Sequence, residues 1–264
     1  MRFVFLFLIP VFSYAFQNKP YFSPLAEFEL YSAYTYSYYN SVEGLGIPYR
    51  SRDSDVDLNL GLRFLPDWEM QVEGEFLKTS HHVLSAESFA GQVRYHFLDD
   101  LSGDAVSLTS GLRLRYVTGR FLHDLSCPYA ATLNLDLVTS IGKEFNRGDQ
   151  WICRIFSYLG AGIGNRGAPY LTPELHLEFN VFRRHQFDFF ALGNFGFGGR
   201  SVSVKQFGYG NTEHYSVDVG ATYRYVIPIW GELYVTYTYR PYAHQFPQRM
   251  QTFLLGYHLP FSLF

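Results

Sequence analysis

The segment from Asp55 to Phe76 constrains the fold of this chain more than any other stretch. Apolar residues occupy every second position on both sides of a Pro66-Asp67 turn: Val56, Leu58, Leu60, Leu62 and Phe64 before it, and Trp68, Met70, Val72 and Phe76 after it. This period of two predicts a pair of antiparallel β-strands, each with one apolar and one polar face. The polar face is rich in acids, which favours a closed barrel with lipid outside and water inside.

The same alternation recurs along the whole chain. It predicts strands at about residues 26–38, 55–64, 68–76, 89–97, 106–116, 131–137, 151–163, 174–181, 187–197, 215–225, 232–240 and 252–260. Their connections are short at 66–67, 183–186 and 227–231 and long at 39–54, 118–128 and 198–212. Barrels with short periplasmic turns and longer outer loops show this contrast. We therefore expect an all-β fold, an antiparallel transmembrane β-barrel of about 12 strands, with roughly 10 or 14 as alternatives.

Aromatic residues make up 19% of the chain, and they gather at both ends of the expected strands. The tryptophans, Trp68, Trp151 and Trp230, fall at short turns. The long-loop ends carry tyrosines: Tyr36, Tyr38, Tyr116, Tyr129, Tyr170, Tyr215, Tyr239 and Tyr242. Two such belts are typical of a barrel in a bilayer. A soluble β-sandwich with its aromatic residues inside is the alternative, but it does not explain the acids between the two aromatic ends.

The N-terminus has the features of an export signal. Arg2 is a short positive region, an apolar run extends from Phe3 to Phe12, and Ser13-Tyr14-Ala15 is a small-x-small cleavage site. We expect residues 1–15 to be a cleaved signal peptide and residues 16–264 to form the barrel; a buried N-terminal strand or helix is the alternative. No later run approaches the roughly 18 apolar residues of a spanning helix, so a membrane protein with this sequence must be a closed barrel.

The chain ends in Phe261-Ser262-Leu263-Phe264. With the signal peptide and the alternating strands, this ending resembles the outer-membrane β-barrel proteins of Gram-negative bacteria as a class. The resemblance implies the bacterial outer membrane as location, its lipid bilayer as surroundings, and an assembly machinery that recognises the last strand through Phe264. One feature departs from the pattern: counting back in twos from Phe264 gives Ser262, Pro260 and His258, whereas the apolar residues lie on the other parity.

Charged residues occupy the face that would line the lumen: Glu27, Glu29, Asp55, Asp57, Arg63, Glu69, Glu73, Glu75, Arg94, Arg113, Arg115, Asp136, Glu174, His176, Glu178, Asp218, Arg224 and Arg240. One interpretation is a porin-like channel for small polar solutes, because rings of charge select ions in pores. An equal alternative is a network of internal salt bridges that fills a narrow barrel, because buried charges demand partners. A barrel of this size fits either.

Phe156 and Tyr158, with Phe190 and Leu192, fall on the expected lumen face. They could form an apolar strip for a hydrophobic solute. We favour the simpler explanation that bulges in these two strands shift the alternation by one residue, which moves every side chain to the other face.

Two groupings in the long loops could support hydrolysis: His81-His82, and His123-Asp124 with Ser126. Outer-membrane lipases, lipid A deacylases and proteases place such residues near the outer rim, so an outer-membrane hydrolase is a second functional hypothesis. A catalytic triad is defined by geometry, however, and no nucleophile-elbow or zinc motif accompanies these residues. A third hypothesis is a non-conducting barrel whose loops bind a partner surface.

The remaining features narrow the expectations further. The formal net charge of −3 does not suggest nucleic acid as a partner. We expect no cofactor and no metal. Cys127 lies in a long loop and Cys153 just after a short turn. Opposite ends of a barrel are too far apart for a disulfide, so we expect two free thiols.

Overall fold

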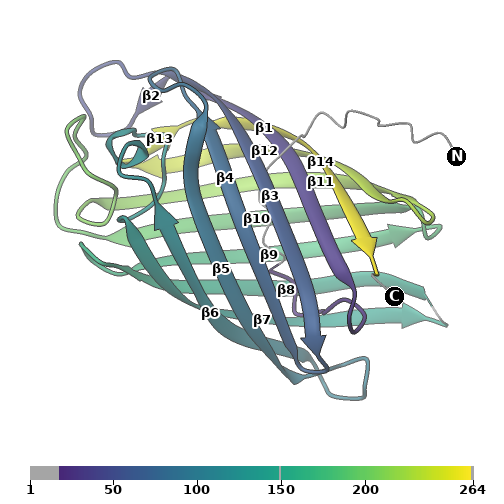
Figure 1. Cartoon of the computed structure of the whole chain (residues 1–264). Helices are drawn as coiled ribbons and strands as arrows, with labels where there is room; N and C mark the ends of the chain where they lie inside the picture. The colour runs from purple at the N-terminus through teal and green to yellow at the C-terminus, as the bar shows by residue number, and fades with distance from the viewer. Residues whose placement is uncertain (1–17, 149, 263–264) are drawn as a thin grey trace, which may run out of the picture.

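The computed structural model describes residues 18–148 and 150–262, and twelve of its strands form one closed antiparallel barrel (Figure 1). These strands are β1 (Phe28–Tyr39), β3 (Ser51–Leu65), β4 (Trp68–Lys78), β5 (Ser85–Leu98), β6 (Ser107–Val117), β7 (Leu133–Arg147), β8 (Gln150–Gly164), β9 (Tyr170–Val181), β10 (His185–Phe197), β11 (Glu213–Ile227), β12 (Gly231–His244) and β14 (Gln251–Phe261). The first strand pairs with the last, which closes the barrel. The predicted fold and strand number are confirmed.

Each strand has one face outside the barrel and one face inside. In β4, Trp68, Met70 and Val72 are exposed on the outside, whereas Glu69 and Glu73 are buried. Leu58, Leu133 and Leu177 also lie on the outer surface, where each is about two-fifths exposed. The apolar faces thus point away from the barrel axis, which is the inverse of a soluble protein. Among the helices that the structure describes, none is long and apolar enough to cross a membrane.

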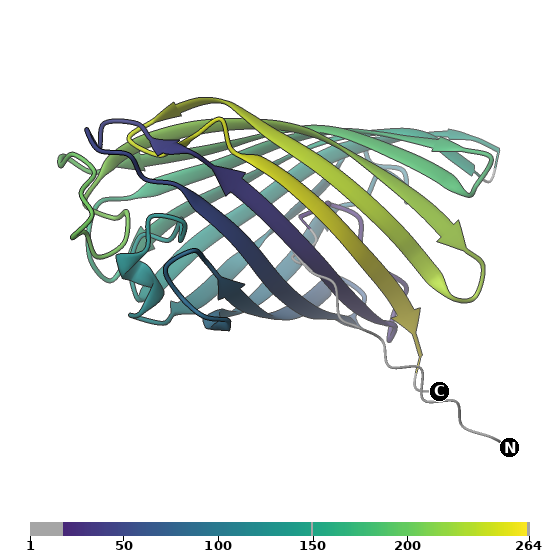
Figure 2. The same ribbon diagram turned by 90° about the horizontal axis from the view of Figure 1, so that it is seen from above.

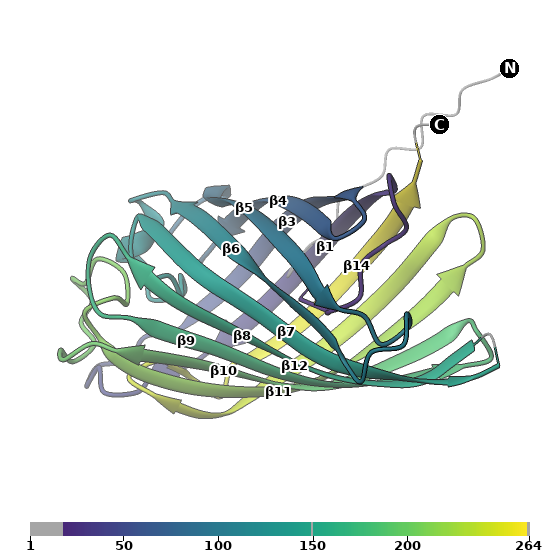
Figure 3. The same cartoon turned by 90° about the horizontal axis from the view of Figure 1, so that it is seen from below.

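The two ends of the barrel differ, as Figures 2 and 3 show. At one end, short turns join neighbouring strands, and β1 begins beside the end of β14. At the other end, long loops carry the two-stranded sheet β2 (Ser41–Val42) with β13 (Pro247–Gln248) and a short 3-10 helix, Phe121–His123. Apolar side chains from these loops and from the adjoining strand ends pack into two buried clusters, Tyr39, Val42, Leu125, Val202, Tyr209 and Phe246 in one and Leu77, Val117, Phe121, Leu122 and Cys127 in the other. The loops therefore form a packed cap.

Several predicted details differ from the structure. β1 begins at Phe28, so Glu27 precedes the strand, and β3 already begins at Ser51, inside the segment predicted as loop. Near the β7–β8 turn, Phe145 pairs with Cys153 but Asn146 pairs with Trp151. The extra residue, Ile152, is a β-bulge that reverses the alternation before it. Trp151 consequently faces the interior rather than the outer surface.

Three aromatic residues thus lie inside the barrel and not in the expected belts. Trp151, Tyr129 and Tyr170 all line the interior cavity. Trp68 and Trp230 remain exposed on the outside at the short-turn end, and Tyr116 and Tyr242 at the long-loop end. The belts are therefore real but smaller than the sequence pattern indicates.

Cys127 and Cys153 are both free thiols. Cys127 is buried in the loop cap, whereas Cys153 lies beside the short β7–β8 turn. They occupy opposite ends of the barrel, as expected. The predicted signal peptide, residues 1–15, and Phe264 lie outside the described residues.

Candidate channel lumen

The barrel encloses a cavity of about 610 Å³ that many charged side chains line. Fourteen of the eighteen residues predicted to line the lumen border it: Glu29, Asp55, Asp57, Glu69, Glu73, Glu75, Arg113, Arg115, Asp136, Glu174, His176, Asp218, Arg224 and Arg240. Glu178 and Arg94 are fully buried behind this surface and form ion pairs with residues near it. Arg63 binds the carbonyl oxygens of Ser23 and Pro66 at the short-turn end. Glu27 lies just before β1.

One wall of the cavity, on β3 to β6, is crowded with carboxylates. Arg115 contacts Glu73 and Glu75, each at 2.6 Å. The hydroxyl group of Tyr129 donates to Glu75 at 2.7 Å, and Ser88 also donates to it. Asp57 lies opposite Glu75 in the β3–β4 pairing. A single guanidinium group therefore serves several buried carboxylates.

The neighbouring β6–β7 region is neutral by comparison. The Arg113 side chain donates to Asp136 at 2.8 Å, and the hydroxyl group of Tyr170 donates to the other oxygen of Asp136 at 2.5 Å. A side chain at Gly162 would overlap both Asp136 and Tyr170, so the absence of a Cβ there permits this contact. The interior position of Tyr170 is thus explained by its bond to a buried carboxylate.

The opposite wall, on β8 to β12, pairs its charges closely. Arg224 donates to Glu178 at 2.6 Å and lies 3.5 Å from Asp188. His176 contacts Asp188 at 3.1 Å. Arg240 holds both oxygens of Asp218, at 2.6 and 2.8 Å. Among the described residues that line the cavity, this wall carries four carboxylates and three arginines, whereas the β3–β6 wall carries seven carboxylates and two arginines. This wall therefore leaves less uncompensated charge than the first.

An apolar strip crosses the same wall. Phe156 and Tyr158 are each 3% exposed and line the cavity with Phe190 and Leu192. The ring of Phe156 stacks on His176, with centroids 4.5 Å apart. The register of β8 with β7 and β9, and that of β10 with β11, has no bulge at these positions. The favoured explanation, that bulges turn these side chains outward, is therefore wrong.

The segment from Asn18 to Ser23 enters the lumen, which the sequence pattern did not predict. Lys19 forms an ion pair with Glu178 at 2.7 Å, and the Asn18 amide donates to Glu174 at 2.9 Å. Arg94 donates to the carbonyl oxygen of Lys19 at 2.7 Å. Residues 18, 19 and 21–23 all line the cavity. The segment therefore narrows the free space inside the barrel.

The candidate hydrolytic residues lie in the loop cap, but they do not form a triad. Thr79 donates to Asp124 at 2.5 Å, and His82 lies 3.8 Å from the same carboxylate. Ser126 meets the hydroxyl group of Tyr39 at 2.9 Å. Within the described ranges, no histidine forms a hydrogen bond with Ser126.

The other two candidate histidines, His81 and His123, also make structural contacts. His123 bonds to the carbonyl oxygen of Gln206, and His81 packs against the ring of Tyr49. Tyr49 donates to Asp124 at 3.2 Å, so this carboxylate connects three loops. The geometry of the cap is that of a structural network rather than a catalytic site.

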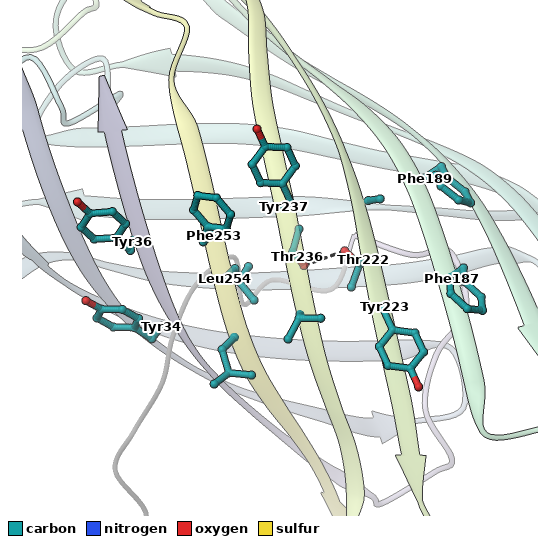
Figure 4. A pocket seen from close by; sticks show the side chains of 13 residues that line it. Tyr34, Tyr36, Phe187, Phe189, Thr222, Tyr223, Thr236, Tyr237, Phe253 and Leu254 are labelled. Atoms are coloured by element: carbon teal, nitrogen blue, oxygen red, sulfur yellow. Dashed lines mark hydrogen bonds between the residues drawn. The ribbon is translucent and has the colours of Figure 1, made fainter. Parts of the chain in front are cut away.

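The outer surface has a shallow apolar groove of about 540 Å³ across β1, β14, β12, β11 and β10 (Figure 4). Large rings border it, including Tyr36, Phe189, Tyr237 and Phe253, whereas Ala221 at its floor is small. Thr222 and Thr236 are bonded to each other at 2.8 Å on the inward side of the same strands. Apart from these inward residues, the groove is lined mostly by side chains of the apolar exterior.

Comparison with protein families finds no family model that matches, and no curated protein matches the sequence. Solved structures do match. An outer-membrane channel from Pseudomonas putida F1 is 10% identical, with a TM-score of 0.67, over 94% of this chain and 100% of that chain. The NanC porin is 7% identical, with a TM-score of 0.58, over 86% of this chain and 98% of that chain.

A third match is the translocator domain of the autotransporter NalP from Neisseria meningitidis. It is 11% identical, with a TM-score of 0.50, over 89% of this chain and 88% of that domain. At such low identities the similarity concerns the fold alone. This chain therefore has the fold of bacterial outer-membrane β-barrel proteins, and the class-level resemblance is confirmed.

Proposed function

We propose that this protein is a narrow channel of the bacterial outer membrane that admits small polar solutes and prefers cations. The observation that carries the proposal is the charge of the lumen. Among the described residues, thirteen Asp or Glu side chains line the cavity, against six Lys or Arg side chains. An excess of carboxylates in a confined aqueous space attracts cations and repels anions.

Two further points support a channel over a solid protein interior. The cavity lies between the charged β3–β6 and β8–β12 walls, and two of the matching structures are described as a channel and a porin. The membrane location itself is supported by the apolar exterior, which suits contact with acyl chains. In this proposal residues 1–15 are removed on export, and the assembly machinery recognises the strand that ends near Phe264.

The test is a planar bilayer recording of the refolded mature chain under a salt gradient. We expect discrete conductance steps, and a reversal potential of the sign that cation permeation gives. Glu174→Gln removes a partly accessible lumen carboxylate and should reduce the cation preference. Asp104→Asn removes the same charge from an exposed turn and serves as the control. A folded barrel that never conducts, or one that prefers anions, would contradict the proposal.

A further inference from the structure

We propose that Asp57, Glu73 and Glu75 bind a divalent cation of the calcium type inside the barrel. Each offers one carboxylate oxygen, and these oxygens all lie within 4.8 Å of one another. Oxygen ligands on opposite sides of Ca²⁺ are about 4.6–5.2 Å apart, because each bond is roughly 2.3–2.6 Å long. The three oxygens can therefore share one ion without a large rearrangement.

The backbone holds these side chains together. Asp57 and Glu75 are direct partners in the β3–β4 pairing, and Glu73 precedes Glu75 by two positions on the same face of β4. All three residues are buried. Ligands on two paired strands are well fixed, which favours a defined site. No sequence motif identifies such a site, because its ligands come from two different strands.

The charge of the group also calls for a cation. Arg115 forms ion pairs with Glu73 and Glu75 and contributes one positive charge. Three carboxylates with one guanidinium carry a net charge of −2, which one divalent ion neutralises. One carboxylate oxygen of Glu73 lies within 4.8 Å of one of Glu75. Carboxylates this close repel each other, and a cation between them removes that repulsion.

An independent observation points to a missing ligand contact. Asn59 is 1% exposed, and neither its amide oxygen nor its amide nitrogen has a hydrogen-bond partner among the residues that the structure describes. Asn59 pairs with Glu73 and lies on the same inward face as Asp57. One oxygen of Asp57, itself 1% exposed, is also unpartnered. Buried polar atoms without partners are rare, and a bound cation would satisfy both oxygens.

The chemistry of the donors selects the ion. Oxygen-only ligands favour hard cations, and neither histidine nor cysteine belongs to the group. Ca²⁺ accepts carboxylate and amide oxygens in irregular geometry, whereas Mg²⁺ requires near-octahedral geometry and keeps its water. The inference does not depend on conduction, because a closed barrel could hold the same ion.

The experiment measures binding to the whole refolded chain in detergent after chelator treatment. Tb³⁺ serves as the luminescent probe, since the Tyr129 hydroxyl lies 2.7 Å from Glu75 and its ring can sensitise a bound lanthanide. We expect saturable luminescence that Ca²⁺ displaces more readily than Mg²⁺. Ca²⁺ should also raise the unfolding temperature, because a ligand that binds only the folded state stabilises it.

The variant that tests the site is Asp57→Asn, which keeps the shape of the side chain and removes its charge. We expect its Ca²⁺ affinity to fall by at least about tenfold. Glu73→Gln is the second variant, should the first fold poorly. The matched control is Asp218→Asn, which removes a lumen carboxylate from β11 and should change the affinity by less than about twofold.

Three results would overturn the inference. The first is the absence of Ca²⁺-displaceable luminescence in the folded wild-type chain. The second is an equal loss of affinity in Asp57→Asn and Asp218→Asn, which would mean diffuse attraction by the whole lumen. The third is that Asp57→Asn is more stable than the wild type and that Ca²⁺ changes the stability of neither protein. This result would mean that protons occupy the cluster.

Discussion

Cys127 shows how the loop cap controls the chemistry of a single residue. Its thiol is fully buried in the cluster with Val117, Phe121 and Leu122. Burial raises the pKa of the Cys127 thiol well above its ordinary value, and the nearby Glu87 carboxyl group raises it further. Because the thiolate is the reactive form, the native residue should be inert to alkylation at ordinary pH.

The corresponding prediction uses a chain with Cys127 as its single thiol, made by Cys153→Ser. We expect maleimide to label the folded variant at pH 8 at least about a hundredfold more slowly than the denatured one, since both burial and the raised pKa oppose the reaction. Intact mass measured over time gives the two rates. Rapid labelling of the folded variant would show that the cap opens readily.

At a few single residues, the alternation in the sequence predicts the wrong face of the barrel. One extra residue, Ile152, reverses the alternation of β8 and turns Trp151 inward, where Arg154 lies 4.2 Å from the centre of its ring. Tyr129 and Tyr170 face the lumen because their hydroxyl groups bond to Glu75 and Asp136. Nothing in local periodicity specifies a bulge or a partner distant in sequence, so these positions could not be predicted.

At the scale of elements, the strands were predictable and the segments between them were not. A strand requires only local alternation, which twelve segments of this chain show. The loop cap and the segment from Asn18 to Ser23 depend on contacts between residues far apart in sequence, such as Lys19 with Glu178. The alternation predicted which side chains face the lumen. It did not predict which of them pair with each other or how large the remaining cavity is.

The segment from Asn18 to Ser23 supports the second prediction, which concerns conduction. Removing residues 18–23, with Gln17 joined to Pro24, deletes side chains that line the cavity and leaves Glu178 paired with Arg224. We expect the single-channel conductance to rise by about twofold or more, because the lumen becomes wider. Bilayer recordings of the refolded variant beside the wild type give the ratio.

The control for this deletion is Lys19→Gln, which keeps the segment but removes its ion pair with Glu178. Its conductance should stay closer to that of the wild type than to that of the deletion. If the deletion and the wild type conduct equally, the segment does not limit the flow of ions.

At the scale of the whole molecule, the arrangement of the two faces is what the sequence determined most securely. Each strand alternates, so closing the sheet places all apolar faces on one side of the wall. The large apolar exterior would be unfavourable in water and is favourable in a bilayer. The polar side then encloses buried ion pairs, which are tolerated because both partners are present.

This arrangement predicts that the cost of a charge depends on its depth along the outer surface. Leu112, at the middle of β6, is 57% exposed on the outside, and Phe182, at the β9–β10 turn, is 85% exposed. In lipid vesicles we expect Leu112→Arg to reduce the free energy of unfolding by about 2–4 kcal/mol and Phe182→Arg by about 0–1 kcal/mol. Reversible denaturant titrations in vesicles measure both. Equal costs at the two positions would mean that the middle of the wall is not immersed in hydrocarbon, and the membrane-spanning assignment would then fail.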